Sequence, residues 1–419
     1  MRHKLNAYLA AALAMLAVAV GAAALGLGGC APEGPPVRAP KIGNEVPLVR
    51  VHLGDDAASL VVAVRGPWRL TADSGEVGKG PRLDWTLCQV QDGEIVFGEA
   101  APVAGAVELA AETDGTIWVR QTVGGTTRER AYRGSVRLGP AAGGVVRVVN
   151  TLPLEAYVAG VLANELVRSW HVETYKALAV AARTYALQER SSRGRYDADV
   201  HDSTASQVYG GCLTETLTAW EAVERTWGIV GTYRGPEGKP TLLRMYYSST
   251  CGGMTASAAE VSSGPVPPPL VGGVSCTWCR QSPKYRWPDV ALTKREIADG
   301  QRRSDAPELA SLGPVDKVEV AERDGPNLRA TLIRIVGASG KSVLVRAANW
   351  RSLVGAGKVP STWFDVEDAG DRILLKNGHG YGHGVGLCQW GAEFLAARGK
   401  TGEEILRYYY PGVELVRAY

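Results

Sequence analysis

Glycine occupies every second position from Gly378 to Gly386 in the stretch GHGYGHGVGLCQWGA (residues 378–392), and this pattern restricts most strongly how this chain can fold. Repeated glycine opposes a helix, because glycine loses more backbone freedom on folding than any other residue. As a strand, the stretch would place His379, Tyr381 and His383 on one face and bare backbone on the other. We expect the bare face to admit the close approach of another backbone or a flat ring.

The two histidines are too far apart on such a strand to share a metal. Four residues of strand span about 13 Å, whereas a zinc ion needs both ligand atoms at about 2 Å. We therefore expect His379 and His383 to line a ligand groove or to order a loop near it. The alternative is a strand that packs tightly for structural reasons.

Composition bounds the class of protein. The 419 residues suffice for one large domain or two ordinary ones. With 45% hydrophobic and 21% charged residues, the chain is typical of globular rather than disordered proteins. A formal net charge of +3 is too small to indicate a nucleic-acid partner, and none is expected.

The N-terminus indicates export. A basic start (MRHK) precedes an apolar run over about residues 8–27, which ends in LGGC at Cys30. This pattern resembles the bacterial lipoprotein box, so we expect a signal peptide over residues 1–29 and lipidation of Cys30. An uncleaved membrane anchor is the alternative. Residues 30–48 are rich in proline and predict a semi-rigid tether, so the rest of the chain would work outside the cytoplasm at a membrane.

Residues 49–150 alternate apolar and polar positions in short runs separated by Gly, Asp and Pro, which predicts a β-rich accessory region. The clearest runs are VRVHL, SLVVAV, IVFGEA, TIWVRQ, SVRLG and VVRVVN. At residue 151 the pattern changes to helical periods, so residues 151–419 are expected to form a mixed α/β core. The predicted fold class is α+β, with the β-rich region packed on or followed by this core.

A first helix is predicted in TLPLEAYVAGVLANEL, where Pro153 suits the first turn. Its apolar stripe contains Leu154, Tyr157, Val158, Val161 and Leu162. The next position on the stripe is Glu165. A carboxyl on an inward face is costly unless it is paired, hydrogen-bonded or lines a cleft, and there it can serve as a proton donor. The alternative is a helix that ends earlier and leaves Glu165 solvated.

A second helix is predicted over residues 173–190, which are rich in alanine and contain no Gly or Pro. Its expected core stripe comprises Tyr175, Leu178, Ala179, Ala182 and Ala186. Lys176 and Arg183 lie seven residues apart and project within about 20° of each other. Two cations on one helix face indicate that an anion or a carboxylate-lined surface lies opposite them. The alternative is that this helix face is simply exposed to solvent.

Apart from Cys30, the chain contains the cysteines Cys88, Cys212, Cys251, Cys276, Cys279 and Cys388. Disulfides are chemically allowed in an exported protein. Cys276 and Cys279 have the spacing of a metal or redox pair, but Pro283 and the lack of a following helix pattern weaken the redox interpretation. A structural disulfide or a zinc site that includes Cys251 stays open.

Several blocks occur in the order of a known family: LPLEAYVAGVLANEL, WHVETYKALAVAARTYAL, DSTASQVYGG, YYSSTCGG, GHGYGHGVGLCQWGA and YYYPGVEL. They closely resemble the stage II sporulation protein D (SpoIID/LytB) family over about residues 140–419. The resemblance implies a lytic transglycosylase whose catalytic acid is Glu165, with Lys176 and Arg183 on the following helix. The implied reaction cleaves the bond between N-acetylmuramic acid and N-acetylglucosamine and leaves a 1,6-anhydro end, in glycan strands already stripped of peptides by an amidase.

The resemblance also suggests which residues contact glycan. They are Lys176, Arg183, Gln207, Tyr209, Ser248, His379, Tyr381, His383 and Gln389. Some relatives hold zinc in the region of VHDSTASQVYGG, but Ala205 and Ser206 replace ligands there, so no catalytic metal or other cofactor is expected. Cys388 and Trp390 stand where serine and tyrosine are usual, and Tyr247 replaces a common histidine.

Two other functions stay open. The first is a glycan-binding module that enhances a cell-wall amidase. The second is a zinc hydrolase that uses His201, His379 or His383.

Overall fold

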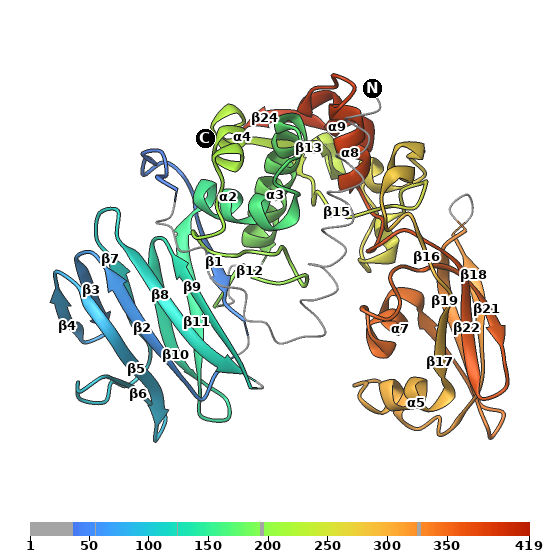
Figure 1. The fold of residues 1–419 in the computed structure, drawn as a ribbon, viewed down its shortest axis with the longest axis horizontal. Coiled ribbons are helices and arrows are strands. Elements are labelled where there is room, and N and C mark those ends of the chain that lie inside the picture. The colour runs from blue at the N-terminus through green and yellow to red at the C-terminus, as the bar shows by residue number, and fades with distance from the viewer. Residues whose placement is uncertain (1–36, 55, 124, 193–196, 325–327) are drawn as a thin grey trace, which may run out of the picture. The chain divides into compact units, whose positions relative to one another are not determined.

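The computed structural model describes residues 37–54, 56–123, 125–192, 197–324 and 328–419. The predicted signal peptide, Cys30 and the start of the tether lie outside them. The chain divides into two compact units (Figure 1). The first contains the described residues up to Ser169, Ala186–Ile229 and Arg417–Tyr419; the second contains Trp170–Tyr185 and Val230–Val416.

The first unit is built on two sheets (Figure 1). The larger has the order β12 (Val200–His201), β1 (Leu48–His52), β11 (Val145–Pro153), β10 (Ser135–Ala141), β7 (Val107–Ala111), β3 (Trp68–Ala72) and β4 (Gly75–Gly80). The smaller has the order β6 (Glu94–Phe97), β5 (Leu83–Gln91), β2 (Ser59–Arg65), β8 (Thr116–Val123) and β9 (Thr126–Tyr132). Contacts of β11 with β5 and β2 join the two sheets.

The period-2 pattern correctly predicted strands in this unit. Four of the six alternating runs lie within β2, β8, β10 and β11, and the other two overlap β1 and β6 but extend past their ends. In β11, Val146, Val148 and Asn150 are buried on one face and pair with β10. Strand β11 continues past residue 150 to Pro153, so the two compact units do not divide at that residue.

Three helices follow the sheets. Helix α2 (Leu154–Glu165) starts directly after Pro153, which stands at its N-cap, and every residue from Leu154 to Leu162 is buried. It packs on β1, β11 and α4 (Leu217–Arg225). Helix α3 (Val172–Ser192) buries the whole predicted stripe from Tyr175 to Ala186 and passes from the second unit into the first. Both helix predictions are confirmed.

The described residues of the second unit form four small sheets. Their strands are β14 (Pro240–Leu242), β13 (Ile229–Arg234) and β24 (Glu414–Arg417); β15 (Tyr247–Ser248) and β23 (Leu387–Cys388); β16 (Arg286–Trp287), β22 (Arg372–His379), β17 (Val290–Thr293) and β21 (Trp363–Asp368); and β18 (Val315–Arg323), β19 (Ala330–Gly337) and β20 (Ser342–Arg346). Trp350, Phe364 and Ile333 lie in the hydrophobic core beneath the last two sheets.

Helices and short 3-10 turns connect these strands. The helices are α5 (Lys294–Arg302), α6 (Pro307–Ala310), α7 (Ala347–Val354), α8 (Gln389–Ala396) and α9 (Gly402–Tyr409), and the 3-10 turns are η1 (Pro236–Gly238), η2 (Ala258–Glu260), η3 (Pro268–Leu270) and η4 (Thr277–Gln281). The α+β class is confirmed. Among the described residues, no helix combines the length and apolar character that a membrane crossing requires.

The prediction of one continuous strand through the alternating glycines is wrong. Strand β22 ends at His379, and Gly380, Gly382, Gly384 and Gly386 all have positive φ angles, between 69° and 96°. A left-handed residue at every second position turns the chain repeatedly, so the segment runs as a loop that only briefly pairs with its neighbours. The expected close approach of backbone is nevertheless present, because a Cβ on Gly380 would lie 2.7 Å from the carbonyl oxygen of Thr250.

Candidate functional site

Glu165 is the last residue of α2 and is half-buried in the first unit. Its Oε1 accepts a hydrogen bond of 2.9 Å from the backbone N–H of Val208. The other glutamate of α2, Glu155, is fully buried, and its Oε1 accepts hydrogen bonds from the N–H of Gly228 and the hydroxyl of Tyr419. Glu155 is thus held as a structural group, whereas Glu165 combines partial exposure with a fixed orientation.

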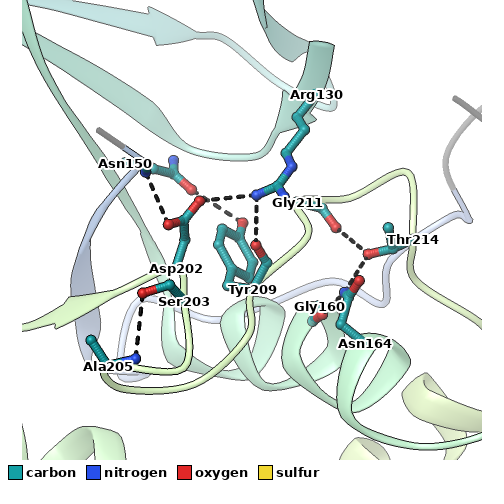
Figure 2. A network of polar contacts seen from close by, with 11 residues as sticks. Arg130, Asn150, Gly160, Asn164, Asp202, Ser203, Ala205, Tyr209, Gly211 and Thr214 are labelled. Carbon is teal, nitrogen blue, oxygen red and sulfur yellow. Dashed lines mark hydrogen bonds and ion pairs between the residues drawn. The ribbon is translucent and has the colours of Figure 1, made fainter. Parts of the chain in front are cut away.

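The loop from Asp202 to Tyr209, which carries Val208, is anchored at both ends (Figure 2). Asp202 accepts hydrogen bonds from the N–H of Gly54 and from Nη1 of Arg130, both at 2.9 Å. The same Arg130 nitrogen donates to the carbonyl oxygen of Tyr209, and the N–H of Tyr209 donates to the carbonyl oxygen of Asp202. The loop is therefore closed on itself and tied to the sheet, which fixes the N–H that orients Glu165.

Residues that follow this loop contact the last turn of α2 (Figure 2). The amide of Asn164 donates to the carbonyl oxygen of Gly160 and to the hydroxyl of Thr214. A Cβ on Gly210 would lie 2.5 Å from the Asn164 amide, and one on Gly160 would lie 2.6 Å from the ring of Tyr209. These glycines allow the loop to press against the helix directly beside Glu165.

Two predicted glycan contacts, Gln207 and Tyr209, lie inside this anchor. Both side chains are 1% exposed. The Tyr157 hydroxyl donates to Oε1 of Gln207, and the Tyr209 hydroxyl donates to Oδ1 of Asn150. The prediction that both residues contact substrate directly is wrong, because neither side chain is exposed. Both side chains instead support the loop that holds Glu165.

Replacing Asp202 by asparagine is expected to destabilise the first unit by about 1–3 kcal/mol, because one buried hydrogen bond from a charged donor is lost. The N–H of Val208 would then also be held less firmly against Glu165. Thermal unfolding measures the loss of stability. The exposed Asp73→Asn serves as the control, and equal behaviour of both variants would refute the anchoring role.

The two cations of α3 have different surroundings. Lys176 is partly buried, and its Nζ lies 2.9 Å and 3.0 Å from the two carboxylate oxygens of Glu173. Arg183 is fully buried, and its Nη1 donates to the carbonyl oxygen of Ala179. The solvated-face alternative is therefore wrong for Arg183, which is buried, and the glycan contacts predicted for Lys176 and Arg183 stay predictions.

An aromatic group surrounds His379 in the second unit. The Trp363 ring stacks on the His379 ring with centroids 5.0 Å apart, and the Tyr285 ring lies at 5.5 Å. Tyr381 is exposed, and the ammonium of Lys284 lies 4.9 Å from its ring centroid. Burial and the nearby Arg286 and Arg329 lower the pKa of His379, so its imidazole is neutral at pH 7. We call Trp363, Tyr285, Lys284, His379 and Tyr381 the aromatic patch.

His383 makes a local hydrogen bond within the glycine loop. Its Nδ1 accepts a hydrogen bond of 3.0 Å from the N–H of Val385, and the ring also hydrogen-bonds the backbone of Tyr247. Burial, together with Arg329 and Arg351, lowers the pKa of His383 to about 4. The neutral ring therefore holds a hydrogen bond within the glycine loop, and its predicted role toward a glycan stays a prediction.

The pKa of His383 predicts a specific acid sensitivity. Because the folded pKa of about 4 lies below the ordinary value of 6.5, this histidine costs nothing above pH 6.5 and weakens folding as pH falls toward 4. The loss reaches about 3 kcal/mol below pH 4. His383→Asn keeps an acceptor near the position of Nδ1 and should flatten this part of the stability curve. Parallel curves of wild type and variant, measured by urea unfolding between pH 4 and 7, would contradict the assignment.

The remaining predicted residues are buried. Ser248 is 6% exposed, and its hydroxyl has no hydrogen-bond partner within the described part of the chain. Gln389 is 5% exposed and is the first residue of α8.

In the first unit, Nδ1 of His201 lies 3.2 Å from Nδ1 of His52, whose Nε2 contacts Asp56.

Comparison with known proteins agrees with the motif order. A family model described as stage II sporulation protein (SpoIID) matches residues 142–233. An uncharacterized protein of Brachyspira hyodysenteriae is 30% identical over 373 residues, which cover 88% of this chain and 93% of that protein. The stage II sporulation protein D of Bacillus subtilis is 28% identical over 286 residues, covering 64% of this chain and 76% of that protein. The chain belongs to the SpoIID family.

A further relative is named for a different role. The amidase enhancer of Bacillus subtilis is 28% identical to this SpoIID-family chain over 293 residues, which cover 61% of the chain but 40% of the enhancer. The family model begins after β10 and spans β11, α2, the Asp202 loop and β13 up to Tyr233. It therefore includes Glu165 and the loop that carries Val208.

Sequence reasoning missed several residues in each of the two units. Asp202 and Arg130 were not singled out, although the aspartate belongs to the DSTASQVYGG block. Trp363 lies in no recognised motif. The sequence had marked the CTWC spacing of Cys276 and Cys279 and left open a zinc site with Cys251. Cys388 is the member that it did not connect with them, and the four sulfurs lie within 4.8 Å of one another.

Proposed function

We propose that this protein acts on the bacterial cell wall as a lytic transglycosylase, with Glu165 as both acid and base. The substrate class is the glycan strands of peptidoglycan. The activity is best assayed on strands from which the stem peptides have been removed. The observation that carries the proposal is the half-buried Glu165 carboxyl, held by the Val208 N–H at the end of α2. The family membership and the names of the Bacillus relatives support the cell-wall context.

A single carboxyl suffices for this chemistry. Ordinary glycosidases need a second carboxylate as nucleophile or base. In a lytic reaction the C6 hydroxyl of the sugar is the nucleophile, so one glutamic acid first protonates the departing glycosidic oxygen. The resulting carboxylate then accepts the proton of the C6 hydroxyl as the 1,6-anhydro ring closes, which restores the acid.

The hydrogen bond to Val208 determines which carboxyl oxygen does this work. Oε1 accepts the backbone N–H, and the carbonyl oxygen of a carboxylic acid is the better acceptor of its two oxygens. We therefore assign the transferred proton to Oε2, and rotation of the carboxyl would break the bond to Val208. Such fixed orientation lowers the barrier, because no reorganisation is needed when the substrate arrives.

The aromatic patch of the second unit suits carbohydrate. Its aromatic side chains offer flat apolar faces, and the Lys284 ammonium offers hydrogen bonds to hydroxyl or carboxylate oxygens. We assign glycan binding to this surface. Purified protein incubated with peptide-stripped glycan strands should release products with anhydro ends, detected by mass spectrometry.

A glycan-binding enhancer of a cell-wall amidase is the second candidate, favoured by the similarity to the amidase enhancer. In that case purified protein would release no anhydro sugar but would raise the rate of an added amidase. The two assays, run on the same preparation, separate the candidates.

We also propose that the protein works outside the cytoplasm, held to a membrane by a lipid on Cys30. The basic start, apolar run and LGGC sequence support this. Incorporation of labelled fatty acid that Cys30→Ala abolishes would support the anchor, and unchanged labelling would contradict it.

A further inference from the structure

Four buried cysteines converge in the second unit from three separate segments. Cys251 follows β15, Cys276 and Cys279 flank the start of η4, and Cys388 ends β23. All four are 0% exposed, and their Sγ atoms lie within 4.8 Å of one another. Within the described ranges this is the group of side chains that could hold a metal ion. The other two described cysteines, Cys88 and Cys212, lie apart in the first unit.

The sulfur spacing fits a tetrahedral metal. Zinc bound to thiolates at about 2.3 Å places neighbouring sulfurs about 3.8 Å apart. Sγ of Cys251 lies 3.6 Å from Sγ of Cys279, close to that value. A disulfide would require about 2.05 Å between one pair of sulfurs. A compact set of four thiols, with two in a C-x-x-C spacing, is the usual donor set of a structural zinc site.

The surroundings of the cluster suit bound thiolates. The N–H of Cys251 donates to Sγ of Cys388 at 3.3 Å, and the Tyr409 hydroxyl lies 3.0 Å from Sγ of Cys276. A Cβ on Gly391 would lie 2.5 Å from the same sulfur, so only glycine leaves room for it. Donors directed at sulfur stabilise a coordinated thiolate and orient it.

A buried cation offsets the charge of such a site. Four thiolates and one Zn²⁺ carry a net charge of −2, which is costly in an apolar interior unless it is compensated. Arg329 is fully buried beside the cluster, and its Nη2 donates to the carbonyl oxygen of Cys251. A Cβ on Gly384 would lie 2.5 Å from this guanidinium, so the glycine loop also makes room for the cation.

We propose that Cys251, Cys276, Cys279 and Cys388 bind one structural Zn²⁺ as thiolates. The ion would join the β15 loop, the η4 turn and β23, and would thereby fix the base of the glycine loop that carries Tyr381 and His383. Each cysteine loses its thiol proton to solvent on binding, and no electron is transferred. The four cysteines belong to the second unit and Glu165 to the first, and we assign the zinc ion no part in bond cleavage.

The test is metal analysis of the purified protein without added metal or chelator. We expect about one zinc per chain by mass spectrometry, with all four cysteines alkylated as free thiols after denaturation in chelator. Cys279→Ser should lower the zinc content at least about fivefold and lower the melting temperature. Cys88→Ser, which replaces a buried cysteine of the first unit, should keep the zinc content of wild type.

Replacing zinc by Co²⁺ provides a measurement that needs no variant. A tetrahedral tetrathiolate site gives intense visible cobalt absorption together with a sulfur-to-metal charge-transfer band, and both should disappear on addition of excess Zn²⁺. The proposal is overturned if wild type contains no zinc and its four cysteines are oxidised in pairs. It is overturned also if the bound metal is iron, or if Cys88→Ser loses zinc to the same extent as Cys279→Ser.

Discussion

Replacing Glu165 by glutamine is expected to reduce release of anhydro-ended glycan by about 10²- to 10⁴-fold, the usual contribution of a positioned general acid–base group. The amide cannot protonate the departing oxygen or accept the proton of the C6 hydroxyl. Its carbonyl oxygen can still accept the N–H of Val208, so the loop and the end of α2 should keep their structure. Mass spectrometry of products from peptide-stripped strands, with melting temperature measured alongside, is the required assay.

Glu224→Gln is the matched control for this experiment. Glu224 is an exposed glutamate of α4 in the same unit, so its substitution makes the same chemical change away from the loop. We expect its turnover to equal that of wild type. A folded Glu165→Gln protein with undiminished turnover would exclude Glu165 as the acid. If wild type itself releases no anhydro product but accelerates an amidase, the enhancer function is favoured instead.

The sequence predicted regular elements well, because their periods directly reflect which face is buried. The stripe from Tyr175 to Ala186 is buried as expected, and Pro153 marks the start of α2. The burial of Arg183 was missed, although Ala179, four residues earlier, belongs to that same stripe. The charge of the side chain received more weight than its position on the helix.

Tertiary arrangement was the part that local patterns could not supply. Alternating glycine has the same period as a strand, and a period carries no information about the sign of φ. Gly380 and Gly384 have left-handed φ angles, and an added Cβ there would meet Thr250 and Arg329, which are distant in the sequence. The cysteine cluster likewise unites positions more than a hundred residues apart, from Cys251 to Cys388, which no spacing rule connects.

Replacing Gly386 by alanine is expected to destabilise the second unit by about 3 kcal/mol. A φ of +69° costs an L-residue about 1–2 kcal/mol, and steric overlap adds about 1–3 kcal/mol. The overlap arises because the new Cβ would lie 2.0 Å from the carbonyl oxygen of Tyr246. That oxygen accepts hydrogen bonds from the N–H of Leu387 and the hydroxyl of Tyr410, so moving it would weaken both.

Gly399→Ala separates the two contributions. Gly399 has a similar φ of +83°, but no atom outside its immediate chain neighbours lies within 4 Å of an added Cβ. It should therefore show the backbone strain alone, about 1–2 kcal/mol. Urea unfolding of both variants gives the difference as the steric cost of the contact with Tyr246. If Gly386→Ala were no less stable than Gly399→Ala, the glycine loop would not be packed against the β15 segment as described, and the alternating glycines would serve backbone conformation only.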